Sequence, residues 1–538
     1  MRTPLILLNL VHAIPIILLT IVPGIDNQGN TVHLSFFDAM YIVAYTATTI
    51  GFGEVPYPFT YEQRMVVFLT IYIAVPAWIY ALGSLIALLQ DKSFISALRL
   101  NAFRRKVRHL DQEFILICGY TDATRLLIDR INRDNHFRIV IIDINPAKIE
   151  SLNGELYMPS IPAIAADASL TEVLKAAGIQ SQDCKFIVTL FDDSQLNLKI
   201  AVRSRILNKQ LKILARAGLK QGRGTLETIG VDHVIDVFNA VAQRIDFALR
   251  SPYLFNLLSW IQGGNLHVSK TDQLPKGIYI VCGRGRIAQA IMTMLEKNNI
   301  AYAYIDFTEE LENRISANQD FFPETDIINA SCIIAATNDD AFNLSIVAAA
   351  RAVNPRIFTI VRENELEERS LFSHLRVDKI FALDQMAAMD AYNYIHRPMT
   401  FRFIESIEIL GEEKYSEILK LITHKINKRP ALIETRINET NMYALSRFLD
   451  EHPVKLGDLL NNPYNDGIDL QMIVLGIERT DGEFIILPDP DVLLKLNDRL
   501  LFTATHPSLK RFNTIVNHYY ELYFVIHRQE ATRFKWPW

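Results

Sequence analysis

The stretch Thr46-Ala47-Thr48-Thr49-Ile50-Gly51-Phe52-Gly53-Glu54 alternates glycine with larger side chains between two apolar runs. Glycine adopts positive φ as readily as negative φ, so this alternation lets several successive carbonyls point to one side. Four copies around an axis would form stacked rings of carbonyl oxygens and a ring of Thr49 hydroxyl groups. Such rings can replace the water around a dehydrated K⁺ ion. We expect Thr49, Ile50, Gly51 and Phe52 to coordinate the ion and Gly53 to complete the loop; the alternative is a plain glycine-containing loop.

Two long apolar segments flank this stretch and indicate a membrane location. Pro4 to Val22 is nearly continuous in Leu, Ile, Val and Ala, and Glu62 to Leu89 is a second such run. About 20 apolar residues cross a bilayer core as a helix, so both segments are long enough to span it. Ser35 to Thr48 is amphipathic and too short to cross, which favours a re-entrant helix that ends at the loop. Arg2 would also suit a signal peptide, but no small-residue cleavage site follows it.

Read as T-x-x-T-x-G-[YF]-G, the stretch from Thr46 to Gly53 resembles the selectivity filter of the potassium-channel family. The resemblance implies a homotetramer, because one loop cannot enclose an ion. It also implies that the inner helix bends near a glycine to open the pore. Gly83 then corresponds to the gating hinge, and Pro76 is a second candidate because proline removes an amide donor. The alternative is that both residues only allow close packing of helices in the membrane.

The distribution of charge predicts the orientation of the chain. A basic run follows the second apolar segment and comprises Lys92, Arg99, Arg104, Arg105, Lys106 and Arg108. By the positive-inside rule, both termini are expected to be cytoplasmic in a multi-pass protein of the cell inner (plasma) membrane. The basic run is expected to lie on the anionic headgroups of the lipid bilayer. The net charge of −5 argues against a globally basic nucleic-acid binder.

Beyond Asp111, short apolar runs alternate with amphipathic helices, which is typical of a parallel doubly wound sheet. Phe186 to Pro252 aligns without a gap with Cys332 to Pro398 at a constant offset of 146 residues. A register of this length indicates a duplicated domain. The identical pairs are Asp193/Asp339, Asn197/Asn343, Leu198/Leu344, Arg205/Arg351, Asn208/Asn354, Arg216/Arg362, Val231/Val377, Asp232/Asp378 and Pro252/Pro398.

The second copy carries a complete nucleotide-binding turn. Gly283-Arg284-Gly285-Arg286-Ile287-Ala288 has the G-x-G-x-x-A pattern between an expected strand and an expected helix. In this pattern the glycines let the backbone approach a pyrophosphate held at the N-terminus of the helix. Asp306 closes the next strand, where a carboxylate binds a free ribose 2′-hydroxyl. This predicts NAD(H) or an adenine nucleotide rather than NADP, and a helix-packing glycine turn without a ligand is the alternative.

The first copy retains less of such a site. Gly119 follows its first strand, but the later glycines of the pattern are missing. Asp122 would also place a negative charge near a phosphate, which is unfavourable at a helix N-terminus. Gly119, Asp143 and Asp167 together form a second candidate nucleotide site. An adenine nucleoside, a cation held by carboxylates, or no ligand all remain open there.

Residues 111 to 538 resemble tandem regulator-of-K⁺-conductance (RCK) domains, the nucleotide-fold modules that form gating rings under potassium channels. The resemblance places Asp193/Asp339 and Asn197/Asn343 in a strand-to-helix loop at the rim of the site, and a helix N-cap is the alternative. In the second copy we expect Asn338 and Asp339 to bind the nucleotide. It implies a membrane α-helical pore with two transmembrane helices and a pore helix, followed by α/β doubly wound, Rossmann-like domains. The expected divisions are a pore domain at 1–90, a linker helix at 91–110, RCK domains at 111–265 and 276–404, and a C-terminal subdomain at 405–538.

These features predict a ligand-gated potassium-selective channel and not an enzyme. The gating ligand would be a nucleotide, Ca²⁺ or both, although no spacing of carboxylates defines a Ca²⁺ site. One alternative is a non-conducting RCK-type regulatory subunit of a cation transporter, which would have no need of the carbonyl loop. The other is a membrane-anchored NAD-dependent oxidoreductase, against which no His, Lys or Tyr constellation lies near the glycine turn. The four cysteines lack C-x-x-C spacing and are expected to be buried and reduced.

Overall fold

The computed structural model describes residues 2–134, 136–155, 157–218, 220–261, 274–306, 327–426, 431–461 and 469–529. The chain forms two compact units, Met1–Arg105 and Lys106–Trp538. The first unit is helical apart from one short hairpin, and the second contains three β-sheets with helices around them. All four cysteines are free and buried, as expected.

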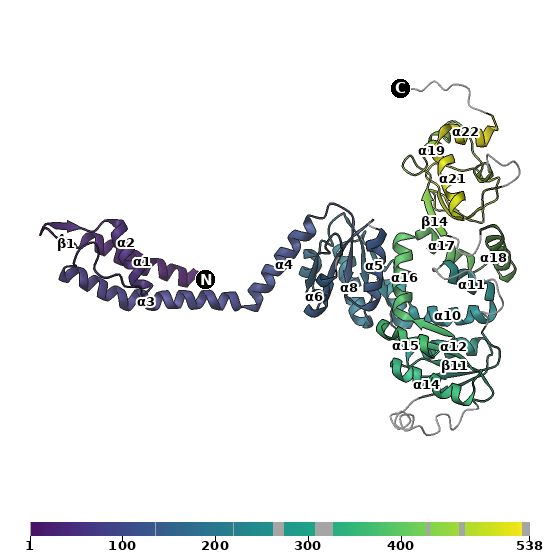
Figure 1. The fold of residues 1–538 in the computed structure, drawn as a ribbon, viewed down its shortest axis with the longest axis horizontal. Coiled ribbons are helices and arrows are strands. Elements are labelled where there is room, and N and C mark those ends of the chain that lie inside the picture. Colours follow the sequence, from purple (N-terminus) through teal and green to yellow (C-terminus); the bar gives the residue numbers. More distant parts are fainter. Residues whose placement is uncertain are drawn as a thin grey trace. The chain divides into compact units, whose positions relative to one another are not determined.

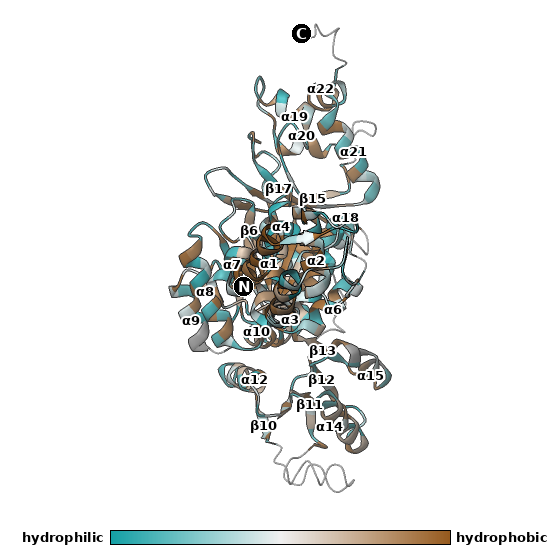
Figure 2. Cartoon of the chain, turned by 90° about the vertical axis from the view of Figure 1, so that its left-hand side faces the viewer, coloured by the Kyte–Doolittle hydropathy of each residue, from teal (hydrophilic) through white to brown (hydrophobic). Residues whose placement is uncertain are grey.

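Two apolar helices form the N-terminal unit together with a short helix between them. α1 (Arg2–Ile21) and α3 (Tyr61–Gln90) are long and apolar enough to cross a membrane, and Figure 2 colours both brown. Most of their large apolar side chains are exposed, whereas the core helix of a water-soluble protein would bury them. Both expected spans are therefore confirmed as helices. The remaining elements here are β1 (Pro23–Ile25), β2 (Thr31–His33), α2 (Phe36–Ala47) and α4 (Lys92–Arg108), the last of which crosses into the second unit.

α2 is the expected short helix before the carbonyl loop. It begins after Ser35, whose hydroxyl accepts a hydrogen bond from the backbone N–H of Asp38 and so caps the helix. Its twelve residues are too few to cross a bilayer. Ile42 and Val43 are buried against residues of α1 such as Leu19. α2 therefore packs within the N-terminal unit and delivers the chain to the loop that follows Ala47.

The first copy of the repeat is built on a sheet of six parallel strands in the order β5-β4-β3-β6-β7-β8. Its central strand β3 (Phe114–Cys118) is buried along its whole length, because helices cover both faces of a parallel sheet. The strand order reverses between β3 and β6, and ligands of such sheets bind at the carboxyl ends of the strands at that point. The other elements are β4 (Arg138–Asp143), β5 (Ala163–Ala165), β6 (Cys184–Thr189), β7 (Lys212–Arg216), β8 (His233–Ile235), α5 (Asp122–Asp134), α6 (Pro146–Gly154), α7 (Thr171–Ala176), α8 (Ser194–Leu207) and α9 (Lys220–Thr228).

The second copy repeats this arrangement with parallel strands in the order β10-β9-β11-β12-β13. Its switch point lies between β9 (Ile278–Cys282) and β11 (Ala330–Ala335). The Rossmann-like α/β fold expected for both copies is confirmed. The other elements are β10 (Tyr302–Ile305), β12 (Phe358–Glu363), β13 (Lys379–Ala382), α12 (Arg286–Lys297), α14 (Asp340–Val353), the 3₁₀-helix η2 (Leu366–Glu368) and α15 (Arg369–His374).

Each copy sends one helix onto the other copy. α10 (Val237–Arg250) of the first copy packs on α12 of the second, and α16 (Leu383–His396) of the second packs on α5 of the first (Figure 1). Pro252 and Pro398 then begin α11 (Pro252–Ile261) and α17 (Pro398–Ile407), because proline is tolerated at the start of a helix. Apolar residues of both copies consequently form one continuous core.

The C-terminal region forms an antiparallel sheet in the order β14-β17-β15-β16. The expected hairpin is confirmed, since β15 (Met472–Glu478) pairs with β16 (Phe484–Ile486). The half-buried carboxylate of Glu434 joins this region to α17 by accepting hydrogen bonds from the backbone N–H and the hydroxyl of Thr400. The other elements are α18 (Glu412–Ile426), β14 (Ala431–Arg436), α19 (Tyr443–Phe448), α20 (Leu456–Leu460), β17 (Arg499–Ala504), α21 (His506–Asn517) and α22 (Tyr519–His527).

The contact between α16 and α5 predicts a dependence of stability on pH. His396 of α16 stacks on Tyr392, and burial lowers its pKa to about 4, although the carboxylate of Asp134 opposes this shift. In the unfolded chain the imidazole of His396 takes up a proton below about pH 6.5, whereas in the folded chain it does so only near pH 4. Between these values the unfolded state binds more protons, so the free energy of unfolding decreases as the pH falls below 6.5. We expect a loss of about 2 kcal/mol at pH 5, or a few degrees in melting temperature.

The measurement is the melting temperature of the full chain in detergent at pH 7.5 and at pH 5. His396→Phe keeps an aromatic ring but cannot titrate, so its melting temperature should fall less than that of the wild type. His424→Phe, at an exposed position on α18, should behave like the wild type. An equal fall in the wild type and in His396→Phe would contradict the assignment.

Candidate functional site

The loop after α2 has the backbone alternation that its sequence predicts. Thr49, Gly51 and Gly53 have positive φ angles of 62°, 65° and 93°, whereas Ile50 and Phe52 between them do not. Left-handed and extended residues in alternation turn successive carbonyls toward the same side of the chain. Thr49 adopts the left-handed region although it carries a branched side chain, which is uncommon. The five residues expected to form the filter therefore share one continuous loop with the required alternation.

Contacts to α2 and α3 hold this loop in place. The hydroxyl of Tyr45 donates to the carbonyl of Gly53 at 2.5 Å, and the ring of Tyr41 stacks on Phe52. The carboxylate of Glu54 accepts from Nε of Arg64 at 2.9 Å and from its Nη2 at 3.1 Å. The sequence predicted none of these three contacts. The sequence signals for these contacts were the two tyrosines one helical turn apart, Tyr41 and Tyr45, and the opposite charges of Glu54 and Arg64 after the glycines.

The two candidate hinge residues lie inside α3. The helix runs without interruption from Tyr61 to Gln90, with Pro76 and Gly83 in its interior. No atom of the described residues would lie within 4 Å of a Cβ atom placed on Gly83. Close packing within this chain therefore does not require glycine at this position, and its role as a hinge stays a prediction.

The glycine turn of the second copy joins β9 to α12. Gly283 has a φ of 115°, and a Cβ atom there would lie 2.9 Å from the carbonyl oxygen of Ala336. This position therefore requires glycine both for its backbone angle and for the close approach of the end of β11. Gly285 occupies the N-cap of α12 and supplies no side-chain hydrogen bond. The first amides of α12 consequently lack a side-chain cap, which leaves them suited to an anion.

A cavity of about 410 Å³ opens above this turn. Its lining residues come from the three loops that follow β9, β10 and β11 and from the first turn of α14, and they are Gly283, Arg284, Gly285, Asp306, Thr337, Asn338, Asp339 and Phe342. Six of these eight residues were predicted for the site, whereas Thr337 and Phe342 were not. The cavity lies at the switch point between β9 and β11, where the fold places ligands. Its position agrees with a nucleotide site.

Two predicted residues lie elsewhere. The side chain of Ile287 is buried in the shared core. Arg286 points away from the cavity, because its Nη1 donates to the carbonyl of Gly218 at 2.6 Å and its guanidinium stacks on the ring of Phe238. Both residues can face a ligand only through their backbone amides. The side chain of Arg286 instead joins the second copy to the first.

The carboxylates of the second copy have distinct roles. Asp306 follows β10, and its Oδ1 lies 3.9 Å from Nε of Arg284. That oxygen is buried and has no hydrogen-bond partner among the described residues, so it can accept from a ligand hydroxyl. Asp339 caps α14 by accepting from the backbone N–H of Phe342 at 2.8 Å. Capping, the alternative for Asp193 and Asp339, is therefore observed, and Asp193 caps α8 in the same way.

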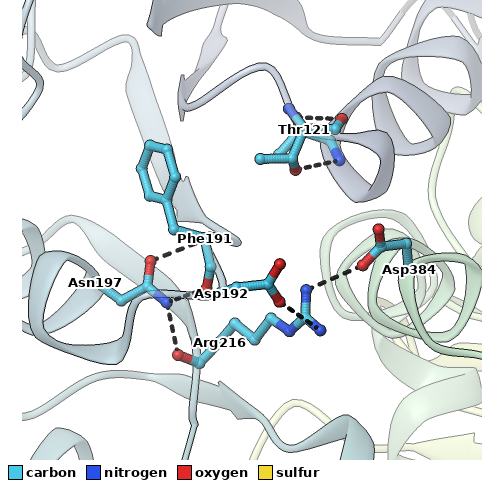
Figure 3. A network of polar contacts seen from close by, with 7 residues as sticks. Thr121, Phe191, Asp192, Asn197, Arg216 and Asp384 are labelled. Carbon is cyan, nitrogen blue, oxygen red and sulfur yellow. Dashed lines mark hydrogen bonds and ion pairs between the residues drawn. The ribbon is translucent and has the colours of Figure 1, made fainter. Parts of the chain in front are cut away.

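The candidate site residues of the first copy contact other residues of their own chain. A Cβ atom at Gly119 would lie 2.5 Å from two ring carbons of Phe191, so this ring lies against the glycine turn (Figure 3). Asp143 accepts from the backbone N–H groups of Tyr120 and Asn145 at 2.6 and 2.7 Å. Asp167 accepts from the N–H of Ser169 at 2.8 Å. Each candidate residue of this copy thus contacts neighbouring residues of its own chain.

Comparison with known proteins assigns these regions to families. Residues 5–91 match the Ion channel family. Residues 115–237 and 279–383 each match the TrkA-N domain family. The two TrkA-N matches coincide with the two parallel sheets, and the ion-channel match covers α1, α2, the carbonyl loop and α3.

Three archaeal proteins are similar in sequence. An uncharacterized protein of Methanothermus fervidus is 28% identical over 46% of this chain and 38% of its own length. Probable potassium channel protein 2 of Methanocaldococcus jannaschii is 26% identical over 45% of this chain and 66% of its own length. Potassium channel protein 1 of the same organism is 25% identical over 37% of this chain and 58% of its own length. The chain thus aligns with between about two fifths and two thirds of the length of these relatives.

Two solved structures also resemble the chain. The GsuK channel bound to NAD is 15% identical and covers 95% of this chain and 97% of its own, with a TM-score of 0.45. GsuK bound to ADP is 17% identical and covers 73% of this chain and 96% of its own, with a TM-score of 0.42. With one ion-channel segment followed by two TrkA-N (RCK) domains, this chain is homologous to archaeal potassium channel proteins.

Proposed function

We propose that four copies of this chain form a potassium-selective channel in the lipid bilayer. The alternation of positive φ angles at Thr49, Gly51 and Gly53 carries this proposal, since it turns the carbonyls of the filter sequence toward one side. A single loop cannot surround an ion, so the pore needs a homotetramer. The names of the two Methanocaldococcus jannaschii relatives agree with this function. The bound ion is K⁺ itself, held by the carbonyls from Thr49 to Phe52.

The second TrkA-N domain is proposed to bind the gating nucleotide. Support comes from the cavity of about 410 Å³, from the glycine N-cap of α12, which has no side chain to bond the first amides, and from the Oδ1 of Asp306, which has no hydrogen-bond partner among the described residues. A carboxylate at this position favours a free ribose 2′-hydroxyl, and therefore NAD(H) or another adenine nucleotide over NADP. The nucleotide can shift the equilibrium between the open and the closed pore only by the difference between its affinities for these two states. Gly83 and Pro76 are proposed as the points at which α3 bends.

The proposed location is the cell inner (plasma) membrane, with both termini and the TrkA-N domains in the cytoplasm. The basic residues after α3 support this orientation through the positive-inside rule. We divide the chain into a pore domain at 1–90, a linker helix at 91–110, two RCK domains at 111–265 and 276–404, and a C-terminal subdomain at 405–538. Within the described residues, no group of three or more His, Cys, Asp or Glu side chains could hold a metal ion. Ca²⁺ is therefore tested beside the nucleotides as a gating ligand and is not assigned a site.

Gly51→Ala should abolish or strongly reduce K⁺ conduction. Gly51 has a φ of 65°, and a Cβ atom in the left-handed region costs about 1–2 kcal/mol, so the loop would rotate its carbonyl away. Gly29→Ala is the matched control, because Gly29 has a φ of 86° in the β1–β2 turn and, as at Gly51, an added Cβ atom would meet no side chain of the described residues within 4 Å. The measurement is K⁺ and Na⁺ flux into proteoliposomes. Full K⁺ selectivity in Gly51→Ala would contradict the proposed filter.

Asp306→Asn should weaken NAD⁺ binding by about tenfold or more without changing ion selectivity. It removes the charge that accepts the ribose hydroxyl, and a hydrogen bond to a charged group contributes about 1.5–3 kcal/mol. The preference for NAD⁺ over NADP⁺ should also shrink in this variant. Asp450→Asn, at an exposed position of the C-terminal region, serves as the control. Equilibrium binding to the purified full chain gives both affinities, and an unchanged NAD⁺ affinity in Asp306→Asn would refute the assignment.

A further inference from the structure

The two copies hold one arginine in different surroundings. Arg216 ends β7, and Arg362 occupies the equivalent position of β12, 146 residues later. Each guanidinium contacts the loop that follows the neighbouring strand. Arg216 contacts Asp192 there, and Arg362 donates to the side chain of Asn338. Asp192 and Asn338 are themselves equivalent positions of the repeat.

In the first copy the arginine is neutralised within the protein. The side chain of Arg216 is only 5% exposed, and its Nη2 lies 3.0 Å from Oδ1 of Asp192. Its Nη1 lies 3.0 Å from Oδ1 of Asp384 on α16. Figure 3 shows both carboxylates on the guanidinium, below the loop that carries Phe191. A buried guanidinium with two carboxylates needs no further anion.

For Arg362 of the second copy, the residues equivalent to these two carboxylates are uncharged. Asn338 takes the place of Asp192, and Phe238 is the residue that the repeat aligns with Asp384. Nε of Arg362 is buried and has no hydrogen-bond partner among the described residues. The positive charge of Arg362 therefore has no carboxylate at the positions equivalent to Asp192 and Asp384. Arg362 is half-buried, and burial of its Nε without a hydrogen-bond partner among the described residues is costly, which makes the site attractive to an anionic ligand.

The other charged groups near Arg362 do not replace the missing carboxylates. Asp192 is engaged with Arg216, and Asp340 accepts from the backbone N–H groups of Asn364 and Glu365. Arg216 and Arg286 add positive charge to the same region. Burial is the largest influence and lowers the pKa of Arg362. The carboxylates of Asp192 and Asp340 oppose this shift of the pKa, whereas the guanidinium groups of Arg216 and Arg286 add to it, so Arg362 is surrounded by charges of both signs.

Arg362 lies beside the glycine turn of the cavity. A Cβ atom on Gly285 would lie 3.8 Å from Nη1 of Arg362 and 3.7 Å from Oδ1 of Asn338. Gly285 and Asn338 both line the cavity, and Gly285 also precedes the uncapped amides of α12. The guanidinium therefore lies close to the N-terminus of α12 and beside two residues that line the cavity. Arginine suits this role because its planar fork of donors matches the oxygens of a phosphate.

We propose that Arg362 binds the diphosphate group of the nucleotide in the second copy, whereas Asp192 and Asp384 take the place of that anion in the first copy. The proposal rests on the nucleotide site of the proposed function and adds the group that its phosphates require. It also accounts for the divergence of the repeat. Arg362 of the second copy binds an external anion. In the first copy the equivalent Arg216 contacts two carboxylates of the protein, and the ring of Phe191 lies against the glycine turn.

The test compares ADP with adenosine on the purified full-length protein by equilibrium binding. Arg362→Met keeps the length of the side chain but removes its charge, so the dissociation constant for ADP should rise at least tenfold while that for adenosine stays unchanged. An unchanged ADP affinity in Arg362→Met would overturn the proposal. Wild-type protein that binds neither compound would instead overturn the proposed nucleotide site itself, so the two failures are distinguishable.

Two further variants separate a phosphate contact from a loss of folding. Asn338→Asp nearly preserves size and gives Arg362 the carboxylate that Arg216 has, so ADP affinity should fall at least tenfold without a lower melting temperature of the ligand-free protein. Arg216→Met is the matched control in the first copy and should lower the melting temperature while leaving ADP affinity unchanged. A loss of ADP affinity in Arg216→Met as large as in Arg362→Met would also overturn the proposal.

Discussion

An ion that leaves water loses its hydration shell, and the protein must supply oxygen atoms in its place. Under the proposed function, these oxygens belong to the backbone of one short loop of this chain, so the φ angles of the loop set the geometry that the ion requires. The loop with positive φ angles at Thr49, Gly51 and Gly53 is held by two contacts at its C-terminal end. Tyr45 fixes it to α2, and Glu54 fixes it to Arg64 of α3. The apolar helices then serve to hold this loop within the membrane.

A second electrostatic requirement explains why the domain is duplicated without being symmetric. Both copies place an arginine under the carboxyl ends of their strands, and such a charge needs an anion when it is buried. Arg216 has carboxylates from both copies, one of them on the helix α16 that the second copy contributes. Arg362 instead contacts the amide side chain of Asn338, which lines the cavity. Under the proposed function, this difference makes one domain responsive to a ligand and the other a fixed part of the assembly.

The sequence predicted those features that depend on local pattern. The apolar runs identified α1 and α3, the strand-turn-helix pattern with Gly283 located the cavity, and the constant offset revealed the duplication. It could not predict which side chains meet across the two copies. The contact of Arg286 with Gly218 and the packing of α16 on α5 both depend on the exchange of helices between copies. The equal spacing of Arg216 and Arg362 was visible, but their different partners required the structure.

The most direct test is to titrate nucleotide against K⁺ flux through wild-type proteoliposomes and to measure nucleotide binding on the same preparation. If the second TrkA-N domain controls the pore, K⁺ flux should exceed Na⁺ flux and should change with nucleotide concentration. The half-maximal change should follow the occupancy of the binding site. K⁺ flux that stays constant while the site fills would contradict the account, and so would the absence of any K⁺ flux at every nucleotide and Ca²⁺ concentration.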